Sequence, residues 1–140
     1  MILIMDKYNT KVTDYTMNVV DGVCTIKCVY NQVVIVVDET EGNDLEVIAG
    51  SDCTISLSGD ANRQRAVYCK SGCTIYNATE VNCEYMCVVY CPSPQSHVNC
   101  IDYCKVVVGD DSFVDYGEKC IIVHGNNPKL TRYNNVKPSV

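Results

Sequence analysis

Eleven cysteines dominate the residues of this chain that could carry out chemistry, and many of them recur four positions apart. The 140-residue chain contains no Cys-x-x-Cys pair, so it lacks the spacing typical of zinc ribbons and dithiol oxidoreductases. Because residues four apart on a strand point to the same face, a Cys-x3-Cys pair is expected to place two thiols on one side of a sheet. This spacing occurs at Cys24/Cys28, Cys69/Cys73, Cys83/Cys87/Cys91 and Cys100/Cys104.

Three roles compete for these thiols. Reduced cysteines are among the most buried residue types, and as small apolar side chains they would need no function beyond packing. Disulfides would instead cross-link an exported protein or an assembled particle, although an odd number of cysteines leaves at least one thiol unpaired. As metal ligands, the candidate residues are Cys91, His97, Cys100 and Cys104. They offer the sulfur and imidazole ligands that zinc binds, but their spacing matches no common zinc site.

No other group of residues predicts catalysis or cofactor binding. The chain has two histidines, and a period of 20 residues would place His124 beside Cys104, but no acidic residue is marked out to orient such a pair. Neither the phosphate-binding pattern GxxxxGK[ST] nor the dinucleotide-binding pattern GxGxxG occurs. We therefore expect a protein that is not an enzyme, with no catalytic residues, no cofactor-binding residues and no cofactor.

Composition indicates strands and excludes several classes of partner. The chain is 47% apolar, with 10 tyrosines, no tryptophan and many valines, which favours β-structure. Its net charge of -6 and pI near 4.7 argue against a nucleic-acid partner. No apolar run is long enough to predict a membrane span. Residues 1–8 lack the features of a signal peptide, so we expect synthesis in the cytosol, with a virion or another assembly as a destination.

A repeat supplies the strongest indication of architecture. The triplet Cys-Thr-Ile occurs at residues 53–55 and again at 73–75, each time directly after a small polar pair. Rows of 20 residues align short apolar segments that are separated by polar turns. A fixed period of this kind predicts an all-β fold, a parallel β-solenoid with rungs of about 20 residues, in which Cys53 and Cys73 stack in the core.

An antiparallel β-sandwich or barrel is the alternative fold. The dipeptide Asp21-Gly22 lies between two apolar segments and predicts a two-residue hairpin, because both residues tolerate the positive φ angles of a type I′ turn. A second hairpin around residues 92–95 fits the same class. It would place cysteines opposite one another in two pairs, Cys83 with Cys104 and Cys87 with Cys100.

Length and charge distribution suggest one domain and a tail. We expect a single all-β domain over residues 1–124 and a basic extension containing Asn and Pro over residues 125–140. The extension carries no acidic residue, so it would suit the acidic segment 38–46 of another copy. The sequence therefore favours a non-enzymatic structural or assembly protein, such as a component of a shell, filament or virus particle, whose partners are further copies or other protein subunits.

Two other functions remain open. One is a carbohydrate- or protein-binding module that uses the abundant tyrosines. The other is a Cys/His metal-binding protein built on the four candidate ligands given above. The sequence does not define a small-molecule ligand.

Overall fold

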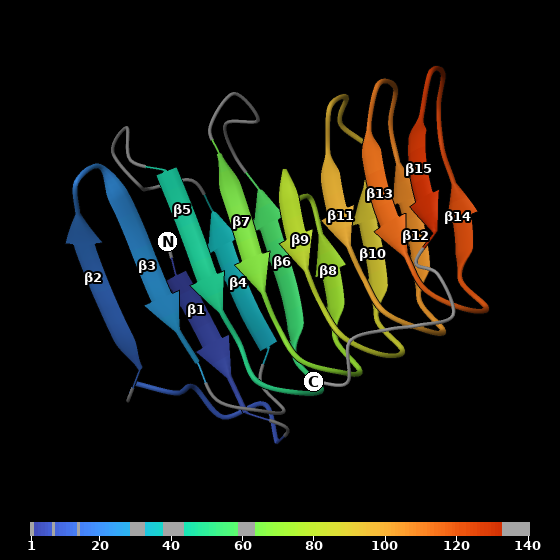
Figure 1. Ribbon diagram of the computed structural model, residues 1–140. Coiled ribbons are helices and arrows are strands. Elements are labelled where there is room, and N and C mark those ends of the chain that lie inside the picture. Colours follow the sequence, from blue (N-terminus) through green and yellow to red (C-terminus); the bar gives the residue numbers. More distant parts are fainter. Residues whose placement is uncertain are drawn as a thin grey trace.

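The computed structural model describes residues 2–6, 8–13, 15–28, 33–37, 44–58 and 64–132. Within these residues all regular structure is β-strand, and the strands form two sheets that face each other along the length of the molecule (Figure 1). No helix of the described residues is long and apolar enough to cross a bilayer.

The two sheets follow the same axis from the first rung to the last. Among the described residues, sheet A has the strand order β1 (Ile2–Met5), β4 (Val33–Val37), β6 (Thr54–Ser58), β8 (Thr74–Tyr76), β10 (Val88–Cys91), β12 (Lys105–Val108) and β14 (Ile121–Val123). Sheet B has the order β2 (Thr16–Val20), β3 (Val23–Lys27), β5 (Asp44–Ile48), β7 (Arg65–Tyr68), β9 (Glu80–Asn82), β11 (His97–Asn99), β13 (Phe113–Tyr116) and β15 (Lys129–Arg132).

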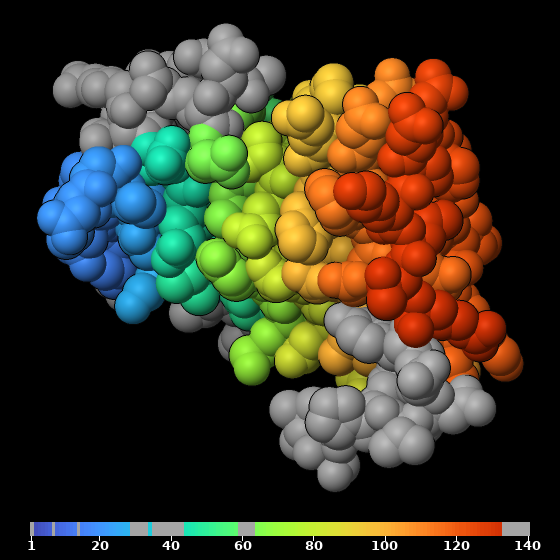
Figure 2. Space-filling model, turned by 45° about the horizontal axis from the view of Figure 1, so that its top comes forward, coloured from blue at the N-terminus to red at the C-terminus, as the bar shows by residue number. Residues whose placement is uncertain are grey.

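From β3 onward, consecutive strands alternate between the sheets and pair in parallel with the strands one rung away, whereas β1 and β2 pair antiparallel with β4 and β3. For example, β8 pairs in parallel with both β6 and β10. The chain is therefore a parallel β-solenoid of about five turns, which confirms the fold predicted from the repeat. The space-filling view shows the same order, because the colours of the chain succeed one another from one end to the other (Figure 2). The antiparallel sandwich is wrong, since β10 and β11, the arms of its second hairpin, belong to different sheets.

The rung length varies along the solenoid. Val34 pairs with Ile55, 21 residues later, and Ile55 pairs with Ile75, 20 residues later. Ile75 then pairs with Val89 after only 14 residues, and Val89 pairs with Val106 after 17. A period of about 20 is thus correct for the rungs that contain the Cys-Thr-Ile triplets and too long for those that follow.

Alternate side chains of every central strand point into a narrow core between the sheets, as the two-residue periodicity of strands requires. Valine and isoleucine stack on themselves from rung to rung, for instance at Val47, Val67 and Val81 in sheet B, where each is fully buried. Cysteines complete this core; those that are buried are Cys24, Cys53, Cys69, Cys73, Cys83, Cys87, Cys91, Cys100 and Cys104.

The first strands depart from the regular pattern, whereas the last described strand continues it. Asp21 and Gly22 have φ angles of 52° and 78° and join β2 to β3 as an antiparallel hairpin, which confirms the turn predicted from the sequence. At the other end, β15 (Lys129–Arg132) pairs in parallel with β13. β15 lies within the extension expected over residues 125–140, of which residues 133–140 lie outside the described residues.

Candidate functional site

Three of the Cys-x3-Cys pairs, Cys69/Cys73, Cys83/Cys87 and Cys100/Cys104, form corners between the two sheets, whereas Cys24/Cys28 and Cys87/Cys91 run along strands β3 and β10 as the spacing suggested. Cys69 follows the end of β7 at Tyr68, and Cys73 precedes the start of β8 at Thr74. The three residues between the cysteines make the turn, and both cysteines are buried. Successive corners therefore stack along one edge of the solenoid, which we call the thiol edge. It contains Cys28, Cys53, Cys69, Cys73, Cys83, Cys87, Cys100, Cys104 and Cys120.

Each corner bends in the same way just before its second cysteine. The residue at that point has a positive φ angle, which is 76° at Gly72, 57° at Met86 and 63° at Tyr103. Only glycine adopts this conformation without a steric cost from its side chain. The repeated backbone bend directs the next side chain inward, so the cysteine that follows each of these residues packs into the core.

The second thiol of each corner donates a hydrogen bond to a carbonyl group one rung earlier. Cys87 Sγ lies 3.2 Å from the carbonyl oxygen of Lys70, and Cys104 Sγ lies 3.1 Å from that of Glu84. Cys120 Sγ lies 3.0 Å from the carbonyl oxygen of Ile101. These bonds add a donor to corner carbonyl groups, of which those of Glu84 and Ile101 also accept hydrogen bonds from the backbone N–H groups of Ile101 and Gly117. Packing and hydrogen bonding thus give the cysteines a structural role.

The thiol edge also gathers sulfur atoms into two groups of three. In each group the sulfur atoms all lie within 4.8 Å of one another. The groups, found by searching the described residues, are Cys83/Cys87/Cys104 and Cys100/Cys104/Cys120, so that Cys104 belongs to both. None of the eleven cysteines, all of which are described, is disulfide-bonded.

Stacking brings these thiols together in a register that the sequence did not indicate. Because Val88 pairs with Lys105, the preceding residues Cys87 and Cys104 are neighbours. Because Asn82 pairs with Asn99, the residues that follow them, Cys83 and Cys100, are neighbours as well. The two corners are therefore stacked and do not face each other across a hairpin, although stacking also brings the sulfur of Cys83 within 4.8 Å of that of Cys104.

Hydrogen bonding within the groups makes the thiols inequivalent. The pKa of Cys104 lies below its usual range because the thiols of Cys100, Cys83 and Cys87 hydrogen-bond to its sulfur. The pKa of each of these three donors is raised, first by its bond to Cys104 and also by burial. Within this network the pKa is thus lowered at Cys104 and raised at its three neighbours.

The four metal ligands proposed from the sequence are not assembled as a site. Cys100 and Cys104 flank one corner, but Cys91 is the last residue of β10, at the opposite end of that strand from the thiol edge. Burial raises the pKa of the Cys91 thiol to about 11, which keeps it protonated near neutral pH. His97 points away from the core, with 46% of its side chain exposed.

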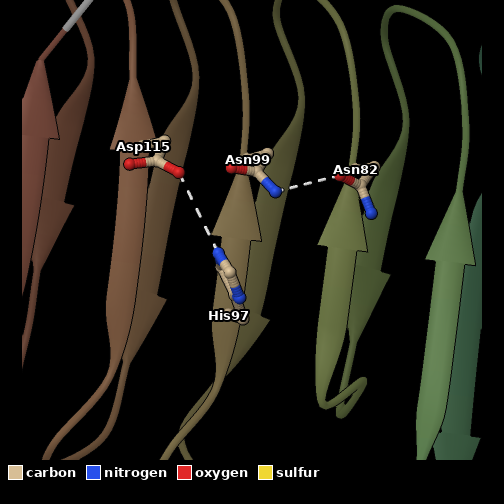
Figure 3. A network of polar contacts seen from close by, with 4 residues as sticks. All are labelled: Asn82, His97, Asn99 and Asp115. Atoms are coloured by element: carbon tan, nitrogen blue, oxygen red, sulfur yellow. Dashed lines mark hydrogen bonds and ion pairs between the residues drawn. The ribbon is translucent and has the colours of Figure 1, made fainter.

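His97 instead belongs to a row of polar contacts on the outer face of sheet B (Figure 3). Its Nε2 lies 3.9 Å from Asp115 Oδ2 on the neighbouring strand β13, and its ring lies 5.6 Å from that of Phe113. Next to it, Asn99 Nδ2 donates a 3.0 Å hydrogen bond to Asn82 Oδ1. The imidazole and the thiols thus lie on opposite faces of the sheet. His124 Nδ1 lies 2.8 Å from the carbonyl oxygen of Gly125. His124 follows Val123, which pairs with Val107, so it lies at the opposite end of the paired strands from Cys104.

One sequence signal would have predicted the sulfur groups. The pair Cys83/Cys87 is repeated 17 residues later as Cys100/Cys104, so both members shift by the same number of residues. This is the rung length of that part of the solenoid, because Val89 pairs with Val106. Aligning the two Cys-x3-Cys pairs directly, without assuming a fixed period, therefore predicts that Cys83 stacks on Cys100 and Cys87 on Cys104.

Comparison of the chain with protein-family models, with curated proteins and with solved structures finds no match.

Proposed function

We propose that this chain is a non-enzymatic structural protein whose copies associate end to end by extending sheet B. The observation that carries the proposal is that sheet B ends on both sides in an exposed strand, β2 (Thr16–Val20) at one end and β15 (Lys129–Arg132) at the other. Exposed strand edges present unpaired backbone groups, and another chain readily pairs with them.

Both end strands also expose apolar side chains on their core-facing side. Val19 pairs with the buried Cys24 and so faces the inside of the sheet, yet 55% of its surface is exposed. Leu130 pairs with the fully buried Val114 and is 39% exposed. Core-facing positions of the central rungs such as Val47, Val67 and Val98 are fully buried, so a second copy would complete the same packing at these two ends.

The pairing of β2 with β15 of another copy would be antiparallel. β15 runs parallel to β13 and through it to the rest of sheet B, whereas β2 runs antiparallel to β3. Such a contact joins two different surfaces, so it is heterologous and propagates into a filament or closes into a ring. The expected contact of residues 125–140 with segment 38–46 is a separate proposal, because residues 38–43 and 133–140 lie outside the described part of the chain.

Single lysines test the two surfaces separately. Val19→Lys and Leu130→Lys each place a charge on the core-facing side of an end strand, and both sites are exposed enough for the single copy to fold. Matched controls are Val20→Lys and Thr131→Lys, which alter the outer face of the same strands. The measurement is molecular mass in solution over a range of concentrations, by light scattering and analytical ultracentrifugation.

We expect the unmodified protein to form concentration-dependent oligomers and each core-facing variant to lose them. A mixture of Val19→Lys and Leu130→Lys retains one intact surface on each partner, so it should form dimers and nothing larger. A two-fold contact of β2 with itself would leave Leu130→Lys fully able to associate. The proposal fails if the unmodified protein stays monomeric or if only the outer-face controls change its mass.

A second candidate function rests on the outer face of sheet A. Tyr76, Tyr90, Val107 and Val123 form one continuous row across four strands, and the rings of the two tyrosines lie 6.3 Å apart. Except for the half-buried Val107, these side chains are exposed by 39% to 55%. Exposed apolar rows of this kind favour binding of a carbohydrate or a protein. Loss of glycan-array or partner binding in Tyr90→Ala, with Tyr103→Ala as the control, would support this function.

A further inference from the structure

We propose that the thiol edge binds a soft monovalent metal ion of the Cu(I) type, through the sulfur atoms of the two groups that share Cys104. Both groups consist of cysteine side chains alone and contain no carboxylate or imidazole. Soft sulfur ligands select soft ions such as Cu(I) over magnesium, calcium or manganese, which prefer oxygen. The chemistry of the ligands thus defines the class of ion.

The spacing of the sulfur atoms suits a three-coordinate ion. An ion at the centre of three sulfurs that are no more than 4.8 Å apart lies at most about 2.8 Å from each, and metal–sulfur bonds of about 2.3 Å need a contraction of only about half an ångström. Rotation of the cysteine side chains supplies such a movement. Structural zinc sites use four ligands, and each group found among the described residues has three, so Cu(I) fits better than zinc.

An ion can reach the groups from two sides. Cys120 is only half-buried, so the group that contains it, Cys100/Cys104/Cys120, is open at its outer member. On the sheet B side, an open groove is lined by Cys83 and Cys100 together with Glu84, whose carboxylate attracts a cation. The group Cys83/Cys87/Cys104 lies one rung closer to the N-terminus, and the Cys104 sulfur is shared by both groups.

Binding exchanges protons for the ion. At each occupied group the S–H bonds of the coordinating thiols break, the corresponding copper–sulfur bonds form, and the protons pass to water. No electron is transferred, because copper enters and stays as Cu(I). The carbonyl groups of Glu84 and Ile101 lose their thiol donors in the process, at a cost that is small beside that of metal–thiolate bonding.

The test is an anaerobic titration of the reduced, full-length protein with Cu(I) supplied as a complex with a weaker competing ligand. Native mass spectrometry gives the number of ions bound, the release of protons is followed in weak buffer, and X-ray absorption at the copper edge identifies the ligand atoms. Zinc is titrated in parallel as the borderline ion. We expect two Cu(I) per chain, one in each group, with sulfur as the only neighbouring atom and weaker binding of zinc.

Variants distinguish this site from unspecific binding to thiols. Cys104→Ser removes a ligand from both groups and should abolish tight binding, while Cys120→Ser should abolish only the ion in the outer group. Cys91→Ser is the matched control, since Cys91 is equally buried and belongs to neither group. Circular dichroism checks that each variant folds; because Cys120 is half-buried in the last turn, its variant tests the proposal even if Cys104→Ser does not fold.

Three results would overturn the proposal. They are an unchanged number of ions in Cys120→Ser, an equal loss of binding in Cys91→Ser, and nitrogen or oxygen as the main neighbours of copper. Zinc binding that is tighter than Cu(I) binding at the same cysteines would contradict the choice of ion.

Discussion

Two adjacent valines in β10 provide a controlled test of the strand orientation in the solenoid. Val89 is fully buried between Ile75 and Val106 of the neighbouring rungs, whereas Val88 points outward and is 41% exposed. The same substitution, valine to alanine, therefore probes the inside and the outside of one strand. Strand propensity changes equally in both variants, so the difference between them reports packing alone.

The magnitude follows from the groups removed. Val89→Ala deletes two buried methyl-sized groups, worth about 1.6 kcal/mol at about 0.8 kcal/mol each. The rungs above and below are held apart by their backbone hydrogen bonds at about 4.8 Å and cannot close the cavity, which raises the total cost to about 2 to 3 kcal/mol. Val88→Ala should cost less than about 1 kcal/mol, as surface substitutions usually do.

Urea unfolding followed by circular dichroism measures both free energies of unfolding, provided that the slopes with denaturant agree. If Val88→Ala costs as much as Val89→Ala, or more, the strand has the opposite orientation and the register is shifted by one residue. A double-mutant cycle extends the test to the stacking itself. Val89→Ala and Val106→Ala should couple by about 0.5 kcal/mol or more, because these side chains are neighbours across one rung, while Val89→Ala and Val47→Ala, two rungs apart, should be additive.

Two further predictions concern the corners and the buried thiols. Gly72 and Met86 occupy equivalent positions with positive φ, so replacing glycine and introducing glycine there should have opposite effects on stability. Gly72→Ala should destabilise the protein by about 1 kcal/mol, because the added Cβ would collide with the Asp52 carboxylate. Met86→Gly should stabilise the protein by roughly 0.5 kcal/mol, because glycine adopts this φ angle without strain. Urea midpoints measure both effects, and shifts of the same sign would contradict the equivalence of the corners. The thiol of Cys91 has a pKa raised by burial from 9.0 to about 11, so it stays protonated in the folded chain over a pH range in which the unfolded chain loses the proton. The unfolded chain then binds fewer protons, and stability falls as pH rises from 9 to about 11, with a slope of about 1.4 kcal/mol per pH unit from this group. Urea unfolding at several pH values should show a shallower decline in Cys91→Ala, and an identical pH dependence of the two proteins would refute the assignment.

Local sequence signals predicted local structure well. Asp21-Gly22 forms the expected hairpin because the positive φ angles of that turn are a property of the two residues themselves. The polar pairs before the two Cys-Thr-Ile triplets are corners, and Thr54 pairs with Thr74 as equivalent strand starts. The thiols of Cys53 and Cys73 are accordingly neighbours in the core, at the beginning of consecutive strands of sheet A.

The stacking of the later rungs could not be derived from a fixed period. The corner at the thiol edge keeps a nearly constant length, since three residues separate its cysteines in Cys69/Cys73 and again in Cys83/Cys87. The connection at the opposite edge changes length: it takes residues 59–64 between β6 and β7 but only residues 77–79 between β8 and β9. Surface connections tolerate such changes at little energetic cost, so the sequence period drifts while the core stays in register.

The sulfur groups depend on this register and were missed for that reason. A ligand set formed within one rung would appear as a sequence motif, whereas the two groups combine cysteines from neighbouring rungs. The candidates chosen by proximity in sequence included Cys91 and His97, which the alternation of the strands places at the far corner and on the outer face. Distance along the chain is a poor guide in a solenoid, where the nearest neighbours are one rung away.

The thiol edge is tested most directly by alkylation of the cysteines, counted by mass spectrometry in the native and the denatured protein under anaerobic conditions. We predict eleven modified thiols after denaturation and, in the native protein, early modification of the half-buried Cys28 and Cys120 only. Cys87 and Cys104, which are fully buried, should react no faster than the chain unfolds. Fewer than eleven reactive thiols after denaturation, or rapid native modification of Cys87 and Cys104, would contradict the stacked, reduced thiol edge described above.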